Sequence, residues 1–99
     1  MAFHIIWSET AVEDLKEIVR FISLDNPDVA VKLAEHIFYH MERAAEMPFS
    51  NRIVPEKGCS EVREFILRPY RIIYTIDSDR KSIGILRIWH GYRGTPNLD

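Results

Sequence analysis

The sequence has little of several features that would commit it to a particular class of protein. It holds one cysteine, Cys59, in 99 residues, so an internal disulfide is excluded and a reducing compartment is favoured. No apolar run approaches the roughly 20 residues that a membrane-spanning helix needs. The first seven residues show no basic leader, which predicts that a secretory signal is absent. We therefore expect a cytoplasmic protein without a membrane partner.

The charge is nearly balanced but unevenly distributed. The length predicts one domain over residues 1–99, and the net charge of −2 gives the chain as a whole no signature of nucleic-acid binding. Residues 1–50 hold four Lys/Arg and nine Asp/Glu, while residues 51–99 hold nine Lys/Arg and six Asp/Glu. Such an asymmetry either concentrates a positive electrostatic field over one face of the protein, or consists of charged side chains that only solvate the outer face of a sheet.

The first half predicts a short strand and a helix. Residues 2–7 alternate between two faces, as in a strand. Ser8 is a plausible helix N-cap, although a capping box that starts at Thr10 fits two residues later. The helix should end near Leu24. Its predicted apolar stripe comprises Ala11, Leu15, Ile18, Val19 and Ile22, and its predicted off-stripe residues are Asp14, Glu17 and Arg20.

A second amphipathic helix follows after a short turn. Asn26 can cap it, and Pro27 suits the first helical position because its missing N–H costs nothing there. Met47-Pro48 should end it, since the residue before proline disfavours helix. The predicted stripe comprises Ala30, Leu33, Ala34, Ile37, Phe38, Met41, Ala44 and Ala45. Two helices joined so closely should form an antiparallel hairpin.

The second half reads as a loop and three strands. Residues 48–60 contain prolines and a glycine and predict an irregular loop. Strands are expected over roughly 61–67, 71–77 and 82–90, with connections short enough for antiparallel hairpins. The order β-α-α-β-β-β predicts an α+β domain in which the helical hairpin packs on a small antiparallel sheet.

This order, with these residues, resembles the RelE/ParE toxin superfamily of type II toxin–antitoxin and plasmid-stabilisation modules. The resemblance covers nearly the whole chain. It rests on Trp7-Ser8, Asn26-Pro27, Met47-Pro48 with Arg52, Val62-Arg63-Glu64, Pro69-Tyr70-Arg71-Ile72-Ile73-Tyr74 and Ile85-Leu86-Arg87-Ile88-Trp89-His90 with Arg93. No one motif is specific, but the ordered set at these spacings is.

The resemblance implies one of two activities. RelE-like members cut mRNA on the ribosome, and ParE-like members bind DNA gyrase and block replication. Both are held inactive by a cognate antitoxin, so a dimer or a hetero-oligomer with the antitoxin is expected. No cofactor is implied.

For a nuclease, four residues are the candidate catalytic set: Arg63, Arg71, His90 and Arg93. Arginine forks stabilise phosphate charge, and a histidine moves protons near neutral pH. Arg71 matches an arginine that the resemblance implies is catalytic in RelE-like nucleases. Arg52 could contact phosphate. The alternative is that Arg63 and Arg71 pair with Glu61, Glu64 or Glu56, and that His90 is structural.

Departures from the RelE pattern favour the ParE-like reading. Phe65 stands where a second basic residue is expected, and Glu61 and Glu64 flank Arg63. A carboxylate there would repel phosphate. The chain also has no room for the C-terminal tyrosine-bearing helix that RelE-like nucleases tend to carry; Tyr92 is the substitute available. A third alternative is a non-toxic member that persists as a binding module.

Other potentially reactive residues carry weaker predictions. His36 and His40 have a spacing that suits a metal, but no third ligand is evident, so no metal site is predicted. Cys59 lacks a recognisable base partner and is interpreted as an incidental thiol. Trp7 and Trp89 are interpreted as core or interface residues.

Overall fold

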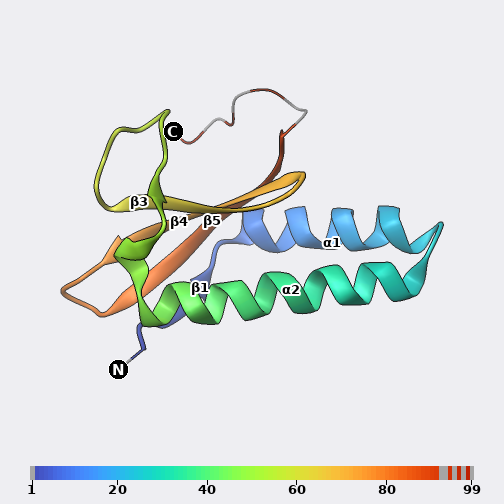
Figure 1. Ribbon diagram of the computed structural model, residues 1–99, viewed down its shortest axis with the longest axis horizontal. Coiled ribbons are helices and arrows are strands. Elements are labelled where there is room, and N and C mark those ends of the chain that lie inside the picture. Colours follow the sequence, from blue (N-terminus) through green and yellow to red (C-terminus); the bar gives the residue numbers. More distant parts are fainter. Residues whose placement is uncertain (1, 92–93, 95, 97, 99) are drawn as a thin grey trace.

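The protein is a two-layer α+β domain. The computed structural model describes residues 2–91, 94, 96 and 98. Its elements are β1 (His4–Trp7), α1 (Glu9–Ser23), α2 (Pro27–Glu46), the 3-10 turn η1 (Pro48–Ser50), β2 (Arg52–Ile53), β3 (Val62–Leu67), β4 (Tyr70–Asp77) and β5 (Ser82–His90). The helical hairpin covers one face of the sheet, which confirms the predicted fold class (Figure 1). Neither helix is long and apolar enough to cross a membrane.

The sheet has five strands in the order β1-β5-β4-β3-β2. The β3–β4 and β4–β5 hairpins are antiparallel, as predicted. Two details of the prediction were wrong. β1 pairs in parallel with β5, so the sheet is mixed, and the segment 48–60 is not wholly irregular, because it contains η1 and β2. The pairing of β1 with β5 joins residues far apart in the sequence, and β2 is only two residues long, so the local pattern of the sequence revealed neither strand pairing.

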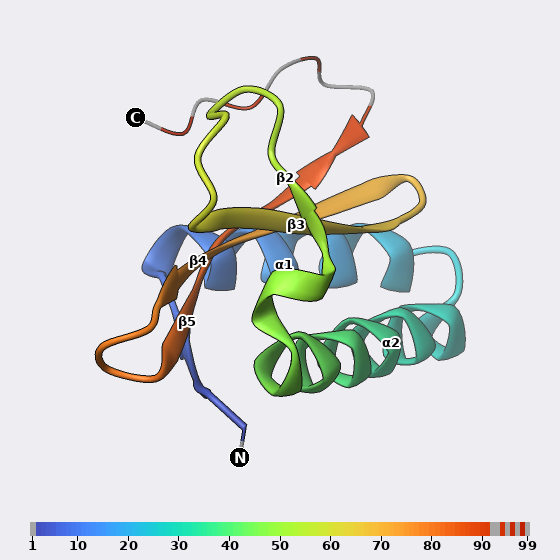
Figure 2. The ribbon, with the colours of Figure 1, turned by 60° about the vertical axis from the view of Figure 1, so that its left-hand side comes forward.

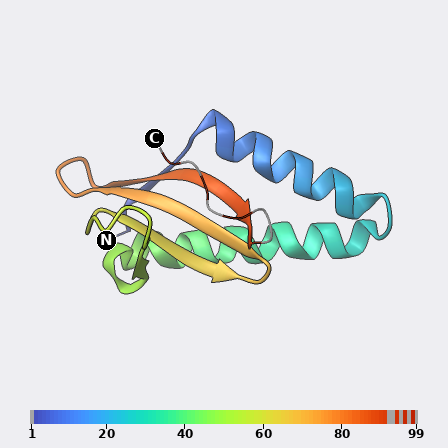
Figure 3. The ribbon, with the colours of Figure 1, turned by 90° about the horizontal axis from the view of Figure 1, so that it is seen from above.

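The helix boundaries follow their capping residues. The Ser8 hydroxyl accepts a hydrogen bond from the Ala11 N–H and begins α1, so the alternative start at Thr10 was wrong. Asn26 caps α2 through the Val29 N–H, with Pro27 at the first helical position, as predicted. The tip of the hairpin projects beyond the ends of the strands (Figures 1 and 3).

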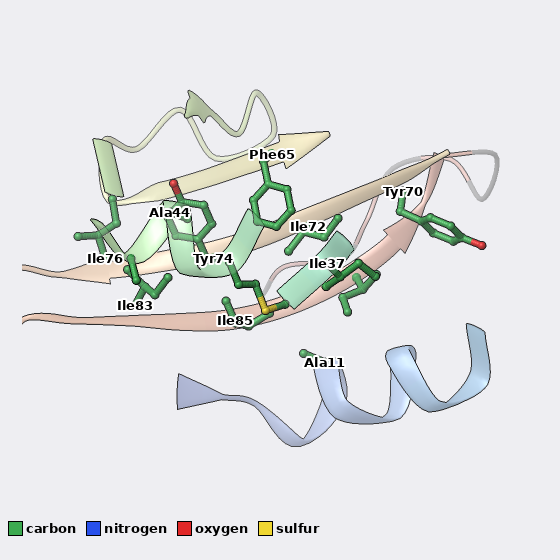
Figure 4. Packing of buried hydrophobic residues seen from close by; sticks show 13 residues of the cluster. Ala11, Ile37, Ala44, Phe65, Tyr70, Ile72, Tyr74, Ile76, Ile83 and Ile85 are labelled. Atoms are coloured by element: carbon green, nitrogen blue, oxygen red, sulfur yellow. The ribbon is translucent and has the colours of Figure 1, made fainter. Parts of the chain in front are cut away.

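The main core lies between the helical hairpin and the sheet. Figure 4 shows side chains from both layers meeting there. Its buried members are Ala11, Ile37, Met41, Ala44, Ala45, Phe65, Tyr70, Ile72, Tyr74, Ile76, Ile83, Ile85 and Ile88. The Tyr74 hydroxyl donates to the Pro48 carbonyl at 2.6 Å, which ties η1 to the sheet.

A second, smaller cluster lies on the other face of the sheet, hereafter the outer face. Val54, Val62 and Ile73 are buried there, and Trp89 and Leu98 pack against them. Figure 2 shows that the β2–β3 segment rises on this side, away from the helices. The outer face is therefore partly covered by its own loop.

Two residues depart from the predicted helix faces. Phe38, predicted for the apolar stripe, is 46% exposed and makes an edge-to-face contact with Trp7. Asp14, predicted to lie off the stripe, is only 8% exposed. It follows Ala11 by three residues and so shares its face.

Candidate functional site

Arg71 lies on the outer face, held by two carboxylates. Its Nε donates to Glu64 at 2.7 Å, and its two terminal nitrogens donate to Glu56 at 2.9 and 2.7 Å. Arg52 contacts the other oxygen of Glu64. Of the two alternatives for Arg71, the structure bears out the pairing with glutamates. We call these four residues the outer-face charge cluster.

The Glu64 carboxylate at the centre of this cluster is completely buried. Register explains the convergence: Glu64 pairs with Arg52 on β2 and with Ile73 on β4, whereas Ile66 pairs with Arg71. Residues that lie opposite one another, or two positions apart on one strand, share a face of the sheet. The strand pairing therefore assembles the cluster, and the β2–β3 segment adds Glu56.

The cluster strongly favours the charged forms of its members. The hydrogen bonds from Arg71 lower the pKa of Glu56 from 4.5 to about 2, although partial burial opposes the shift. The same contact raises the pKa of Arg71 above its ordinary value. All three nitrogens of the Arg71 guanidinium donate to carboxylates, so a phosphate would have to displace Glu56 to reach its fork.

Arg63 lies away from this cluster. It pairs in register with Tyr74, whose side chain belongs to the core on the helix-facing side. Its guanidinium donates to the carbonyls of Ser60, Phe49 and Asn51 at 2.8 to 2.9 Å. The alternative in which Arg63 pairs with a glutamate was wrong, because its guanidinium donates to backbone carbonyls instead.

His90 lies on the helix-facing side, where its ring meets Tyr70 edge to face at 5.4 Å. The structure therefore does not bring His90 and Arg71 together: they lie on opposite faces of the sheet. Arg93, the fourth candidate, and Tyr92 lie outside the described residues. Of the predicted catalytic set, no two described members share a site.

A cleft of about 480 Å³ opens beside His90, between α1 and the ends of β4 and β5. α1 lines it with Asp14, Glu17, Ile18 and Phe21, and the sheet lines it with Tyr70, Ile88 and His90. Figure 4 shows Tyr70 at the end of the core, with its hydroxyl pointing away from the packed side chains.

Sequence reasoning missed the role of Asp14 at this cleft. Its carboxylate accepts two hydrogen bonds from Arg87, at 2.8 and 2.9 Å, and one from the Ile88 N–H at 3.0 Å. The pairing raises the pKa of Arg87 above its ordinary value. A carboxylate on the same helix face as Ala11 was the signal available in the sequence. Asp14 thereby joins α1 to the edge of β5, beyond the last residue of β1.

The remaining residues singled out from the sequence belong neither to the outer-face charge cluster nor to the lining of the cleft. In the described part of the chain, no three His, Cys, Asp or Glu side chains gather as metal ligands. His36 is exposed, and His40 lies against Phe65 with ring centroids 5.7 Å apart. The Cys59 thiol donates to Glu61 at 3.1 Å, and this contact is the main cause that lowers the pKa of Glu61. Trp89 packs in the outer cluster, and its indole donates to the Gly94 carbonyl at 2.9 Å.

Solved structures share this fold. A chain of the chromosomal ParDE toxin–antitoxin system of P. aeruginosa superposes with a TM-score of 0.70 at 23% identity, over 90% of this chain and 96% of that one. A chain of the RelBE2 toxin–antitoxin complex of Mycobacterium tuberculosis gives 0.61 at 20% identity, over 91% and 99%. A mutant of the E. coli toxin RelE in the free state gives 0.63 at 15% identity, over 95% and 88%. These likenesses establish the fold.

Sequence comparison identifies the family. The family model described as "ParE toxin of type II toxin-antitoxin system, parDE" matches residues 5–94. A curated protein of Sinorhizobium fredii, named "Putative toxin Y4kP", is 32% identical over 94 residues, which is 93% of this chain and 92% of that protein. The match spans both helices, the outer-face charge cluster and the cleft. The chain belongs to the ParE toxin family of type II toxin–antitoxin systems.

Proposed function

We propose that this toxin acts by binding DNA gyrase and blocking replication, without catalysing a reaction itself. The observation that carries the proposal is the state of Arg71. The RelE-like reading needs its guanidinium free to stabilise the charge of a scissile phosphate. Glu64 and Glu56 already accept hydrogen bonds from all three of its nitrogens.

The dispersal of the other candidates supports the same conclusion. A general acid or base must come within hydrogen-bonding reach of the reacting atoms. His90 lies on the opposite face of the sheet from Arg71, and Arg63 donates to three backbone carbonyls. A net charge of −2 also suits a protein target better than a ribosomal RNA surface.

A cognate antitoxin is the second partner of this proposal. The helical hairpin exposes Phe21, Leu24 and Val31 at 76%, 85% and 58%, and such apolar surface is usually covered by a partner. We propose that the antitoxin covers part of this hairpin and so keeps the toxin inactive.

A supercoiling assay with purified toxin and gyrase tests the gyrase proposal. We expect a molar excess of toxin to block the supercoiling of relaxed plasmid, because bound toxin prevents gyrase from completing its catalytic cycle. Heat-denatured toxin at the same concentration is the control. Normal supercoiling at excess folded toxin would contradict the proposal.

The alternative function, a ribosome-dependent mRNA endonuclease, gives a different result in cells. The chain shares its fold with the E. coli toxin RelE, so this alternative is tested as well. Primer extension on translated mRNA after toxin induction would then show discrete new 5′ ends. We expect intact mRNA together with filamentation, the response to blocked replication. Growth without arrest would instead favour a member that has lost its toxicity.

A further inference from the structure

Among the residues that the structure describes, the cleft beside His90 combines an apolar wall with a net negative charge. Ile18 and Phe21 on α1 face Tyr70 and Ile88 across it. Its volume of about 480 Å³ falls in the range of sites that bind small ligands or anchoring side chains. The wall is therefore large enough to hold one long side chain of a partner.

The charge of the cleft comes from Glu17. Asp14 also lines it, but Arg87 neutralises that carboxylate with two hydrogen bonds. Glu17 is exposed and attracts Arg87 at longer range, so Asp14, Glu17 and Arg87 together leave one net negative charge at this wall. An occupant that brings a cation would gain an attraction here, while a phosphate would be repelled.

The cleft continues onto the projecting tip of the hairpin. Phe21 belongs to both, and Leu24 follows it one turn later at 85% exposure. The strands do not reach this tip (Figure 3). An occupant of the cleft could thus extend over a contiguous apolar surface with an acidic residue beside it.

We infer that this cleft binds a segment of a partner protein in which a large apolar residue lies next to a lysine or arginine. The apolar side chain packs on Phe21, Ile18 and Tyr70, and the basic side chain reaches Glu17. Lys and Arg bury their aliphatic stems on such walls while the charged head stays at the rim. Charge complementarity selects this occupant over a nucleic acid. The inference concerns the partner's chemistry and holds whether or not that partner is gyrase.

Three matched probes test the inference: 4-phenylbutylammonium, 4-phenylbutanol and 4-phenylbutyrate. They carry a positive, a neutral and a negative head; the ammonium and the alcohol share a phenyl ring and four methylenes, and the carboxylate has three methylenes and its carboxyl carbon. Titration into ¹⁵N-labelled full-length protein should shift the amides of Ile18, Phe21 and Ile88. We expect the cation to bind about threefold more tightly than the alcohol, the effect of one exposed ion pair, and the carboxylate to bind most weakly.

Two variants identify the contacts. Glu17→Gln should abolish the advantage of the cation over the alcohol and leave the affinity for the alcohol unchanged. Glu13→Gln, one turn earlier on α1 and outside the cleft, should keep the advantage. Phe21→Ala removes an exposed side chain, so the fold should persist while all three probes bind more weakly.

The inference fails on any of three results. Equal binding of the three probes would leave only a hydrophobic pocket, and tightest binding of the carboxylate would indicate an anionic partner such as a nucleic acid. Shifts confined to residues outside the cleft would place the binding elsewhere. None of these results depends on gyrase, so they leave the proposed function to its own assay.

Discussion

Glu64 shows how one buried charge decides what its neighbours can do. A carboxylate taken out of water loses several kcal/mol of hydration, and it persists only where opposite charges and hydrogen bonds replace that water. Arg71 and Arg52 supply them, each on a different oxygen. Arg71 thereby stabilises the folded structure through its ion pairs with Glu64 and Glu56.

The two arginines around Glu64 should contribute very differently to stability. The Arg71 side chain is 15% exposed and that of Arg52 is 56% exposed. Arg71→Ala leaves a buried charge poorly compensated and should cost about 3 kcal/mol. Arg52→Ala should cost less than about 1 kcal/mol, because water screens an exposed pair. Urea unfolding of both variants measures the difference, and equal losses would contradict this account.

Acid should loosen the contact between Glu56 and Arg71. Folding lowers the pKa of Glu56 from 4.5 to about 2, so the folded state holds the charged form more tightly than the unfolded chain does. The resulting stability is fully present above pH 4.5 and declines as the pH falls toward 2. The free energy of unfolding, measured against pH, should therefore differ between the wild type and Glu56→Gln near neutrality. This difference should shrink below pH 4.5; a constant difference would exclude the contact as its source.

At the scale of the elements, β1 lies beside the first part of β5, and α1 lies beside the part of β5 that follows. β1 ends at Trp7, yet β5 continues to His90. Ser8 then donates to the Leu86 carbonyl at 3.0 Å, and Asp14 accepts from the Ile88 N–H. Side chains of the helix thus satisfy an edge that a strand would otherwise cover.

The two N-caps should respond differently to the same substitution. Ser8 accepts from Ala11 and also donates to Leu86, whereas Asn26 makes one cap bond at an exposed position. Asn26→Ala should cost about 1 kcal/mol, the usual value of a lost cap. Ser8→Ala should cost about 2 kcal/mol, because it also leaves the Leu86 carbonyl unpaired. Thermal or chemical unfolding measures the loss of stability in each variant. A larger loss for Asn26→Ala than for Ser8→Ala would contradict this prediction.

At the scale of the whole molecule, charge sets the kind of partner. Three basic residues of the second half, Arg63, Arg71 and Arg87, are held in internal contacts. Part of the positive charge of residues 51–99 is therefore neutralised inside the fold, while Arg80 and Lys81 stay exposed. The helical hairpin exposes apolar side chains such as Phe21 and Leu24, together with the acidic side chain of Glu17.

RNA should consequently bind this protein weakly. Non-specific binders that neutralise many phosphates reach dissociation constants of roughly 10⁻⁴ to 10⁻⁶ M at physiological salt. We expect affinity weaker than this range for a fluorescent single-stranded RNA in anisotropy titrations, with little dependence on salt. Tight binding that weakens steeply as salt rises would instead reveal a phosphate-binding face.

The sequence by itself determined the local structure and the family. Capping residues, proline and apolar periodicity placed both helices and the three long strands, since these signals act within a few residues. The ordered motifs from Trp7 to Arg93 identified the superfamily. That Arg71 pairs with glutamates was one of two readings left open, and the choice between them needed the structure.

Only the tertiary structure decided which side chains meet. β1 joins β5 across nearly the whole chain, and Asp14 reaches Arg87 and Ile88 for the same reason. Spacing along a strand gives the relative faces of its own residues. This spacing does not indicate which face of the sheet the helices cover, or which segment packs on the opposite face. The separation of Arg71 from His90, and the closure of Glu56 over Arg71, follow from that packing.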